Sequence, residues 1–249
     1  THIYSNQFDD DLAEVMERAA QNEVQRLLLP NIDSNSTKRM WDVVNAYPKR
    51  CFPMMGIHPC SVNESIADEL KHIETELATG KYIAVGEIGI DLYWDKTFIK
   101  EQIAAFEQQM EWAKELKLPI AIHCRDSFDE IFASVEKVQD GSLRGVLHCF
   151  TGNEAQAKKC IDLGLHIGLG GVLTFKNSGL ADAENLGGQK LAGLLQSIGQ
   201  LPLGCRQGFN VKAGHETSHP LWQRLRHLLE VETEIELARL KHVIEARRL

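Results

Sequence analysis

Strand-length apolar runs alternate with amphipathic, helix-length segments along most of this chain, and few folds satisfy such a pattern. The apolar runs predict strands over residues 24–29, 51–56, 82–86, 119–123, 145–148 and 166–168. Between them, apolar side chains recur at three- and four-residue spacing, which predicts helices over residues 9–21, 37–46, 65–77, 98–116 and 154–163. Repeated strand–helix units are typical of an α/β fold built on a parallel sheet.

The same alternation favours one domain. No linker, low-complexity tract or second type of composition interrupts the 249 residues, so we expect a single domain over residues 1–249. Two more helices are predicted near its end, over residues 221–230 and 232–249. With 43% apolar residues, a chain of this length can bury one large core.

Charge and cysteine content narrow the class of protein. The 27 basic and 35 acidic residues give a net charge of −8, which argues against a broad basic surface that holds nucleic acid by counterion release. A polyanionic substrate must then be held locally. The six cysteines form no CxxC pair, which favours a reducing, cytoplasmic location. No apolar run approaches the roughly 18 residues that cross a bilayer, and no signal-peptide core is visible, so we expect no membrane association.

Side chains that can bind metal follow four successive predicted strands. His58 stands in Gly-Ile-His-Pro, Glu87 in Gly-Glu-Ile-Gly-Ile-Asp, His123 in His-Cys-Arg-Asp and His148 in His-Cys-Phe-Thr-Gly. Active sites of (β/α) barrels lie at the carboxyl ends of the strands, so these side chains would share one rim. A single histidine could instead be a core residue with its ring nitrogens satisfied internally. Together they favour metal ligation, because imidazole is a common ligand of divalent ions.

Glu87 could be a solvated loop carboxylate, but its neighbours favour a metal site. Glycines on both sides allow close approach of the backbone, and a carboxylate between two imidazoles can bridge two cations, as in two-metal phosphoesterases. Asp91 lies four residues further on, beyond the predicted strand, and is expected to cap or orient other groups rather than to bind metal.

Two residues at the same rim are candidates for contact with substrate. His58 precedes Pro59, which favours an extended backbone at the rim, where it could reach substrate or support a ligand. Arg125 follows His123, and its guanidinium could bind a phosphate in bidentate fashion. The alternative is a local salt bridge with Asp126, which could also cap the next helix.

These motifs, in this order and spacing, resemble the TatD-related deoxyribonucleases over roughly residues 1–184. The resemblance implies a TIM-type (β/α)8 barrel of the amidohydrolase superfamily that hydrolyses DNA phosphodiesters at a divalent metal site. It also implies four metal ligands, His2, Glu87, His123 and His148. His58 matches the histidine of the family's Gly-x-His-Pro motif, which we place near the substrate, as we do Arg125.

The two ends of the barrel depart from the family pattern. The family's first strand usually ends in His-x-His; His2 matches the second histidine, so its partner and most of that strand would precede Thr1. The last strand should end in Glu-Thr-Asp-x-Pro-Tyr, whose aspartate binds metal and positions water, but residues 201–210 contain no such motif. First and eighth strands are therefore expected to be missing or atypical, and no catalytic residue is assigned. Either the aspartate is lost or its segment is absent from this sequence; the cost of open sheet edges favours the second.

The expected function is metal-dependent cleavage of DNA. Two divalent ions, chosen from Mg²⁺, Mn²⁺ and Zn²⁺, would activate water for attack on phosphorus, and Arg125 would offset charge on the phosphate. The acidic composition favours single strands or strand ends over long duplexes. No protein partner is indicated.

Two alternatives stay open. One is another amidohydrolase-type metallohydrolase, acting on an amide or lactone; these usually use a bridging carbamylated lysine, and no predicted strand ends in lysine. The other is a catalytically impaired barrel that acts as a binding module, which metal content without turnover would reveal.

Overall fold

The computed structural model describes residues 1–22, 24–169 and 210–211. The chain divides into two compact units, Thr1–Ile167 and Gly168–Leu249. Nearly all of the described residues belong to the first unit, which also carries every site residue predicted above. The predicted helices over residues 221–230 and 232–249 lie outside the described residues.

All strand pairs in the described residues are parallel. β1 pairs with β2, and β3, β4, β5, β6 and β7 pair in that order. A bridge between Met55 and Val85 continues the series from β2 to β3. The strands are β1 (Leu27–Pro30), β2 (Cys51–Met54), β3 (Val85–Asp91), β4 (Ile120–Arg125), β5 (Gly145–Leu147), β6 (Leu165–Leu169) and β7 (Asn210–Val211).

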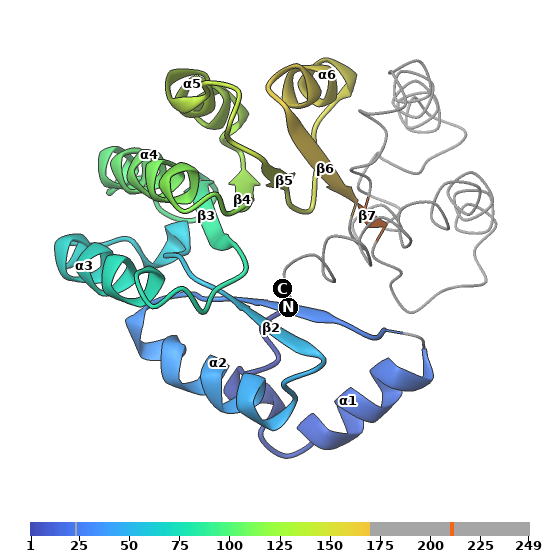
Figure 1. The fold of residues 1–249 in the computed structure, drawn as a ribbon. Coiled ribbons are helices and arrows are strands. Elements are labelled where there is room, and N and C mark those ends of the chain that lie inside the picture. Colours follow the sequence, from blue (N-terminus) through green and yellow to red (C-terminus); the bar gives the residue numbers. More distant parts are fainter. Residues whose placement is uncertain (23, 170–209, 212–249) are drawn as a thin grey trace, which may run out of the picture. The chain divides into compact units, whose positions relative to one another are not determined.

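The α-helices of the first unit lie on the outer side of its strands (Figure 1). They are α1 (Leu12–Gln21), α2 (Ser34–Ala46), α3 (Ile66–Leu77), α4 (Ile99–Glu115), α5 (Phe128–Val138) and α6 (Glu154–Asp162). Two short 3-10 helices, η1 (Asn6–Phe8) and η2 (Pro59–Ser61), precede α1 and α3. All seven residues of β3 are buried, as expected for a parallel strand covered on both faces. Phe106 and Met110 of α4 are fully buried, as are Ile88 and Ile90 of β3. This core supports the carboxyl ends of β3 and β4, where the predicted site residues Glu87 and His123 lie.

The predicted strands and helices form, with shifted ends. β3 begins three residues later than expected and continues to Asp91, so Glu87 and Asp91 lie within the strand rather than beyond it. Helix α5 was not among the expected helices, although Phe128, Ile131 and Val135 show helical spacing. Ser127, not Asp126, occupies its N-cap position, so the suggested capping role of Asp126 was wrong.

Strand β7 is the last described strand, and its described residues are Asn210 and Val211. It pairs with Gly168 and Leu169 of β6, within the second unit. The expectation of missing or atypical first and eighth strands stays a prediction, because the residues on either side of β7 lie outside the described part of the chain. In that same part, no helix combines the length and the apolar character that crossing a bilayer requires. Cys51, Cys60, Cys124 and Cys160 are free thiols.

Candidate metal and substrate site

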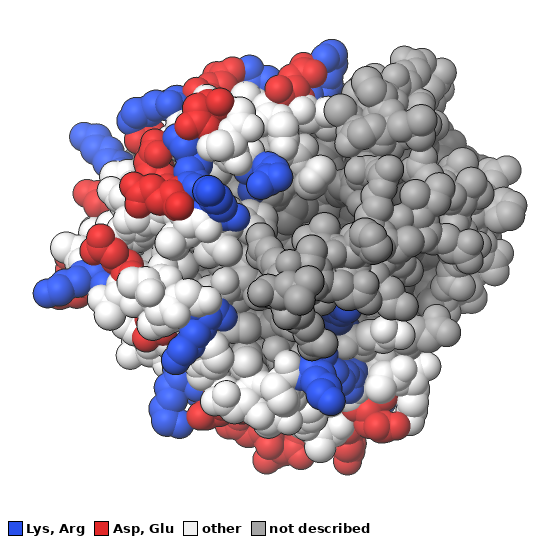
Figure 2. All heavy atoms as spheres, in the orientation of Figure 1, with Lys and Arg blue, Asp and Glu red and all other residues white. Residues whose placement is uncertain are grey.

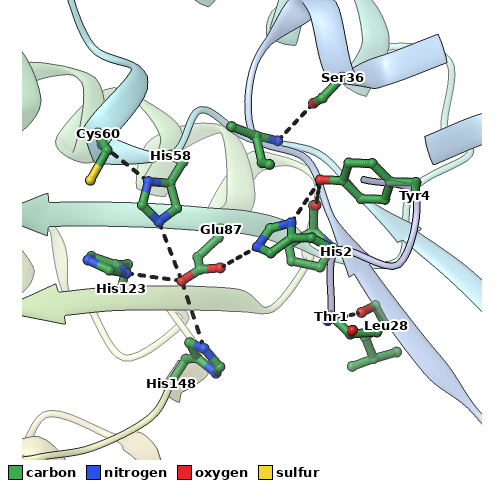
Figure 3. A network of polar contacts seen from close by, with 12 residues as sticks. Thr1, His2, Tyr4, Leu28, Ser36, His58, Cys60, Glu87, His123 and His148 are labelled. Atoms are coloured by element: carbon green, nitrogen blue, oxygen red, sulfur yellow. Dashed lines mark hydrogen bonds and ion pairs between the residues drawn. The ribbon is translucent and has the colours of Figure 1, made fainter. Parts of the chain in front are cut away.

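Four histidines converge on the carboxylate of Glu87 (Figure 3). Nitrogens of His123, His58 and His148 lie 3.1, 3.8 and 3.8 Å from Oε1, and Nε2 of His2 lies 3.4 Å from Oε2. The histidines come from four places: ahead of η1, after β2, in β4 and after β5. Glu87 itself is only 6% exposed. The structure therefore brings together the four predicted ligands and His58.

Parallel strands explain the convergence, because their carboxyl ends meet at one edge of the sheet. β3 and β4 pair with Gly89 opposite His123, after a shift of register between Val85 and Ile88. Gly89 has a φ of +142°, and a Cβ at this position would lie 2.0 Å from the backbone oxygen of His123. Only glycine permits so close an approach, which brings His123 against Glu87. The glycines around Glu87 thus have the role that the sequence suggested.

Glu87 is an anion at neutral pH. Burial favours its neutral form and would raise the pKa of the carboxyl. Hydrogen bonds from His123 and His2, with the electrostatic effect of His148 and His58, outweigh burial and hold the pKa well below its usual range. A buried carboxylate anion surrounded by imidazoles is the donor set expected for a divalent transition metal ion.

Asp91 orients His123, as the sequence suggested. The Nε2–H group of His123 donates to Oδ2 of Asp91 over 2.8 Å, which directs Nδ1 at Glu87. Burial lowers the pKa of His123, but the carboxylates of Glu87 and Asp91 outweigh it and raise the pKa above its ordinary value. Asp91 is 2% exposed and accepts backbone N–H groups of Tyr93 and Trp94 at its other oxygen. Metal-binding histidines commonly donate their second nitrogen to such a carboxylate.

Tyr4 orients His2 in a similar way. Burial raises the pKa of the Tyr4 hydroxyl well above its ordinary value, so the hydroxyl keeps its proton, which it donates to the carbonyl of Pro30 over 2.5 Å. Nδ1 of His2 lies 2.9 Å from the same hydroxyl oxygen and must therefore be the donor. This contact orients the ring so that Nε2 faces Glu87.

A cation fits this arrangement. Nε2 of His2 and Nδ1 of His123 face carboxylate oxygens of Glu87 at 3.4 and 3.1 Å, so a proton or a metal ion must lie between each nitrogen and its oxygen. Two acceptors facing each other repel unless a proton or a cation lies between them. Donor atoms that share a tetrahedral ion at 2.0–2.1 Å are about 3.3 Å apart, which agrees with these separations.

His58 has the opposite orientation. Its Nδ1 accepts the backbone N–H of Cys60 over 3.2 Å, so the proton of the neutral ring is on Nε2, the nitrogen directed toward Glu87. Burial lowers the pKa of His58 to about 4, because it outweighs the opposing effect of Glu87, and the ring is neutral at neutral pH. The donor atoms of His58, Glu87 and His123 lie within 4.8 Å of one another, so distance alone would admit His58 as a ligand. Its tautomer suits a hydrogen-bond donor to substrate instead.

Arg125 ends β4 opposite Asp91, and its side chain lies over two aromatic rings. Its Cζ is 3.7 Å from the ring centre of Tyr93 and 5.2 Å from that of Trp94. Sequence reasoning missed this aromatic pair, as it missed the role of Tyr4. The available signal was two large aromatic residues in succession just after a strand that carries site residues.

Comparisons with known proteins identify the family. The model of the TatD related DNase family matches residues 1–187. An uncharacterised metal-dependent hydrolase, YabD of Bacillus subtilis (strain 168), is 32% identical over 177 residues, which are 71% of this chain and 69% of that protein. The 3'-5' ssDNA/RNA exonuclease TatD of Citrobacter rodentium (strain ICC168) is 33% identical over 185 residues, 74% of this chain and 70% of that protein.

Solved structures support the same assignment. The crystal structure of YJJV, a TatD homolog from Escherichia coli K12, superposes with a TM-score of 0.68 at 25% identity, over 84% of this chain and 74% of that one. An uncharacterised amidohydrolase from Saccharomyces cerevisiae shares the fold with a TM-score of 0.65 at 19% identity, over 90% and 74%. These likenesses and the parallel strands confirm an α/β fold of the TIM-barrel type. The chain belongs to the TatD-related DNase family and is a metal-dependent hydrolase of that family.

Proposed function

We propose that this protein is a divalent-metal-dependent nuclease that cleaves phosphodiester bonds of DNA, acting on single strands or strand ends, and that residues 1–249 form one barrel domain. The observation that carries the proposal is the convergence of imidazole nitrogens, those of His2 and His123 foremost, on an anionic and buried Glu87. Family membership and the exonuclease activity named for the C. rodentium relative support nucleic acid as the substrate.

The ligands proposed for the metal are His2, Glu87, His123 and His148. Two ions are proposed because the two oxygens of Glu87 face different partners: Oε2 faces His2, while Oε1 faces His123 and His148. Mixed imidazole and carboxylate ligation admits Zn²⁺, Mn²⁺ and Mg²⁺. When bound, the ions supply Lewis-acid stabilisation of the phosphate and a source of nucleophilic water at neutral pH.

The remaining residues bind and orient the substrate. His58 presents an Nε2–H donor to the same space and can donate to a non-bridging phosphate oxygen. Arg125, held by its contact with Tyr93, adds a permanent positive charge and paired N–H donors for the phosphate. Asp91 and Tyr4 hold the rings of His123 and His2 in the orientations that direct one nitrogen of each ring at Glu87. The residue that positions the attacking water is not assigned to the described part of the chain.

The direct test is nucleotide release from single-stranded DNA. We expect purified protein to release nucleotides when Mg²⁺ or Mn²⁺ is added and to stop when a chelator is added. Release from single-stranded RNA but not from single-stranded DNA would show that RNA, rather than DNA, is the substrate. No release from folded protein that binds metal would contradict the nuclease assignment and favour a binding module or an amide or lactone substrate.

Substitution of Arg125 tests the phosphate contact. Arg125→Ala is expected to raise the KM for single-stranded DNA about tenfold or more, because a charge-assisted hydrogen bond contributes roughly 1.5–3 kcal/mol. Bound metal should not change. Arg144→Ala is the matched control, since Arg144 is exposed and precedes β5, at the other end of the strands. An unaltered KM in Arg125→Ala would remove Arg125 from the substrate site.

A further inference from the structure

Tyr93 and Trp94 are the most exposed aromatic residues of the described chain. Their exposed fractions are 53% and 69%, although the buried strand β3 ends at Asp91, only two residues before Tyr93. Exposed aromatic rings that lie together usually mark a binding surface, because leaving them in water forgoes the free energy of burial.

The two rings and Arg125 form one ordered cluster. The ring centres of Tyr93 and Trp94 are 4.8 Å apart with an interplanar angle of 89°, so the rings meet edge to face. The guanidinium of Arg125 covers the ring of Tyr93 at 3.7 Å. Each of the three side chains offers a planar surface on which a nucleobase can stack.

A single carboxylate ties this cluster to the histidine site. One oxygen of Asp91 accepts the backbone N–H groups of Tyr93 and Trp94 at 3.0 and 3.3 Å. Its other oxygen accepts from Nε2 of His123 at 2.8 Å. The aromatic pair is therefore held beside the group that the cleaved phosphate would approach, at a place that adjoining nucleotides would pass.

We propose that Tyr93 and Trp94 form a stacking platform for unpaired nucleobases of the substrate strand. The proposal rests on the proposed function and specifies how its substrate is recognised. Bases in a duplex are already stacked and paired, whereas a free strand can place a base on an exposed ring. The platform therefore selects single-stranded substrate at a place next to the histidines that surround Glu87.

The charge distribution is consistent with base stacking as the main source of affinity for the strand. The net charge is −8, and acidic and basic side chains are interspersed over the described part of the face in Figure 2. Counterion release can then supply only a limited share of the binding free energy. Stacking contributes roughly 1–3 kcal/mol per base without positive charge, so two exposed rings can compensate.

Binding of a short single-stranded DNA in the presence of chelator tests the platform without turnover. Trp94→Ala and Tyr93→Ala are each expected to raise the Kd about 5- to 150-fold. Trp94→Phe should restore most of the affinity, because it keeps a ring. Leu116→Ala is the matched control: Leu116 is 43% exposed but lies at the C-cap of α4, before β4 begins. Unchanged Kd in both alanine variants would overturn the proposal and favour a protein partner for the aromatic pair.

A modified oligonucleotide separates stacking from a structural role. Replacing single nucleosides by abasic residues should weaken binding by the wild-type protein at one position and have little effect on Trp94→Ala at that position. Loss of equal size in both proteins would overturn the platform. The logarithm of affinity should fall with the logarithm of salt concentration with a slope of about −1, as for one or two phosphate contacts. A slope several times steeper would contradict stacking as the main source of affinity.

These outcomes are distinct from those of the nuclease assay. Binding that depends on Trp94 in a protein that releases no nucleotides would retain the platform and reject the nuclease. Metal-dependent release with binding that does not depend on either ring would retain the nuclease and reject the platform.

Discussion

Glu87→Gln is expected to remove bound divalent metal and to lower the turnover of single-stranded DNA roughly a hundred- to a thousandfold. Glutamine keeps the shape of the side chain and loses its charge. In the wild-type protein one carboxylate oxygen faces His2 and the other faces His123. In the variant, the amide N–H₂ group replaces one of these two oxygens. The substitution therefore removes both the anion that balances the cation and one of the oxygens that would bind it.

Metal content and turnover should be measured together on this variant. Glu107→Gln is the control, because Glu107 is a partly buried carboxylate of α4 that pairs with Lys137 rather than with histidine. We expect the control to keep its metal and its turnover. If Glu87→Gln kept both as well, Glu87 would not be a metal ligand and the proposed site would be wrong.

Gly89→Ala is expected to lower the free energy of unfolding by about 2–4 kcal/mol, as a combined cost of overpacking and of positive φ. The added Cβ would meet the backbone oxygen of His123 at 2.0 Å, so β3 and β4 would have to separate. That separation moves His123 away from Glu87, and bound metal should decrease as well. Chemical denaturation measures the first effect and metal titration the second.

Gly80→Ala serves as its control. Gly80 also has a positive φ, +68°, but a Cβ there would have no heavy atom within 4 Å. We expect a loss of about 1 kcal/mol, from the backbone conformation alone, and no change in metal binding. Equal losses in the two variants would show that the close approach of β3 to β4 is not what requires glycine at position 89.

Much of the fold and of the site's composition follows from local pattern. Strands β1 to β6 formed where short apolar runs predicted them, because parallel strands covered by helices must be apolar along their length. The apolar runs also predicted that Glu87, His123 and His148 lie at one edge of the sheet, because each of these residues stands in or just after a run. Helix α5 lies outside the predicted helices, although Phe128, Ile131 and Val135 have regular helical spacing.

In a parallel sheet, the direction of the strands converts position along the chain into a place at the edge of the sheet, so local pattern predicts which side chains lie at the rim. What each histidine can do there depends on contacts that form only in the folded protein. The second nitrogens of His2, His58 and His123 meet Tyr4, the backbone of Cys60 and Asp91, respectively, and these partners fix how each ring faces Glu87. The hydroxyl of Tyr4 in turn donates its proton to the carbonyl of Pro30, 26 residues further along the chain. A ring orientation set by partners from other elements leaves no trace in local spacing, so it emerges only when the chain is folded.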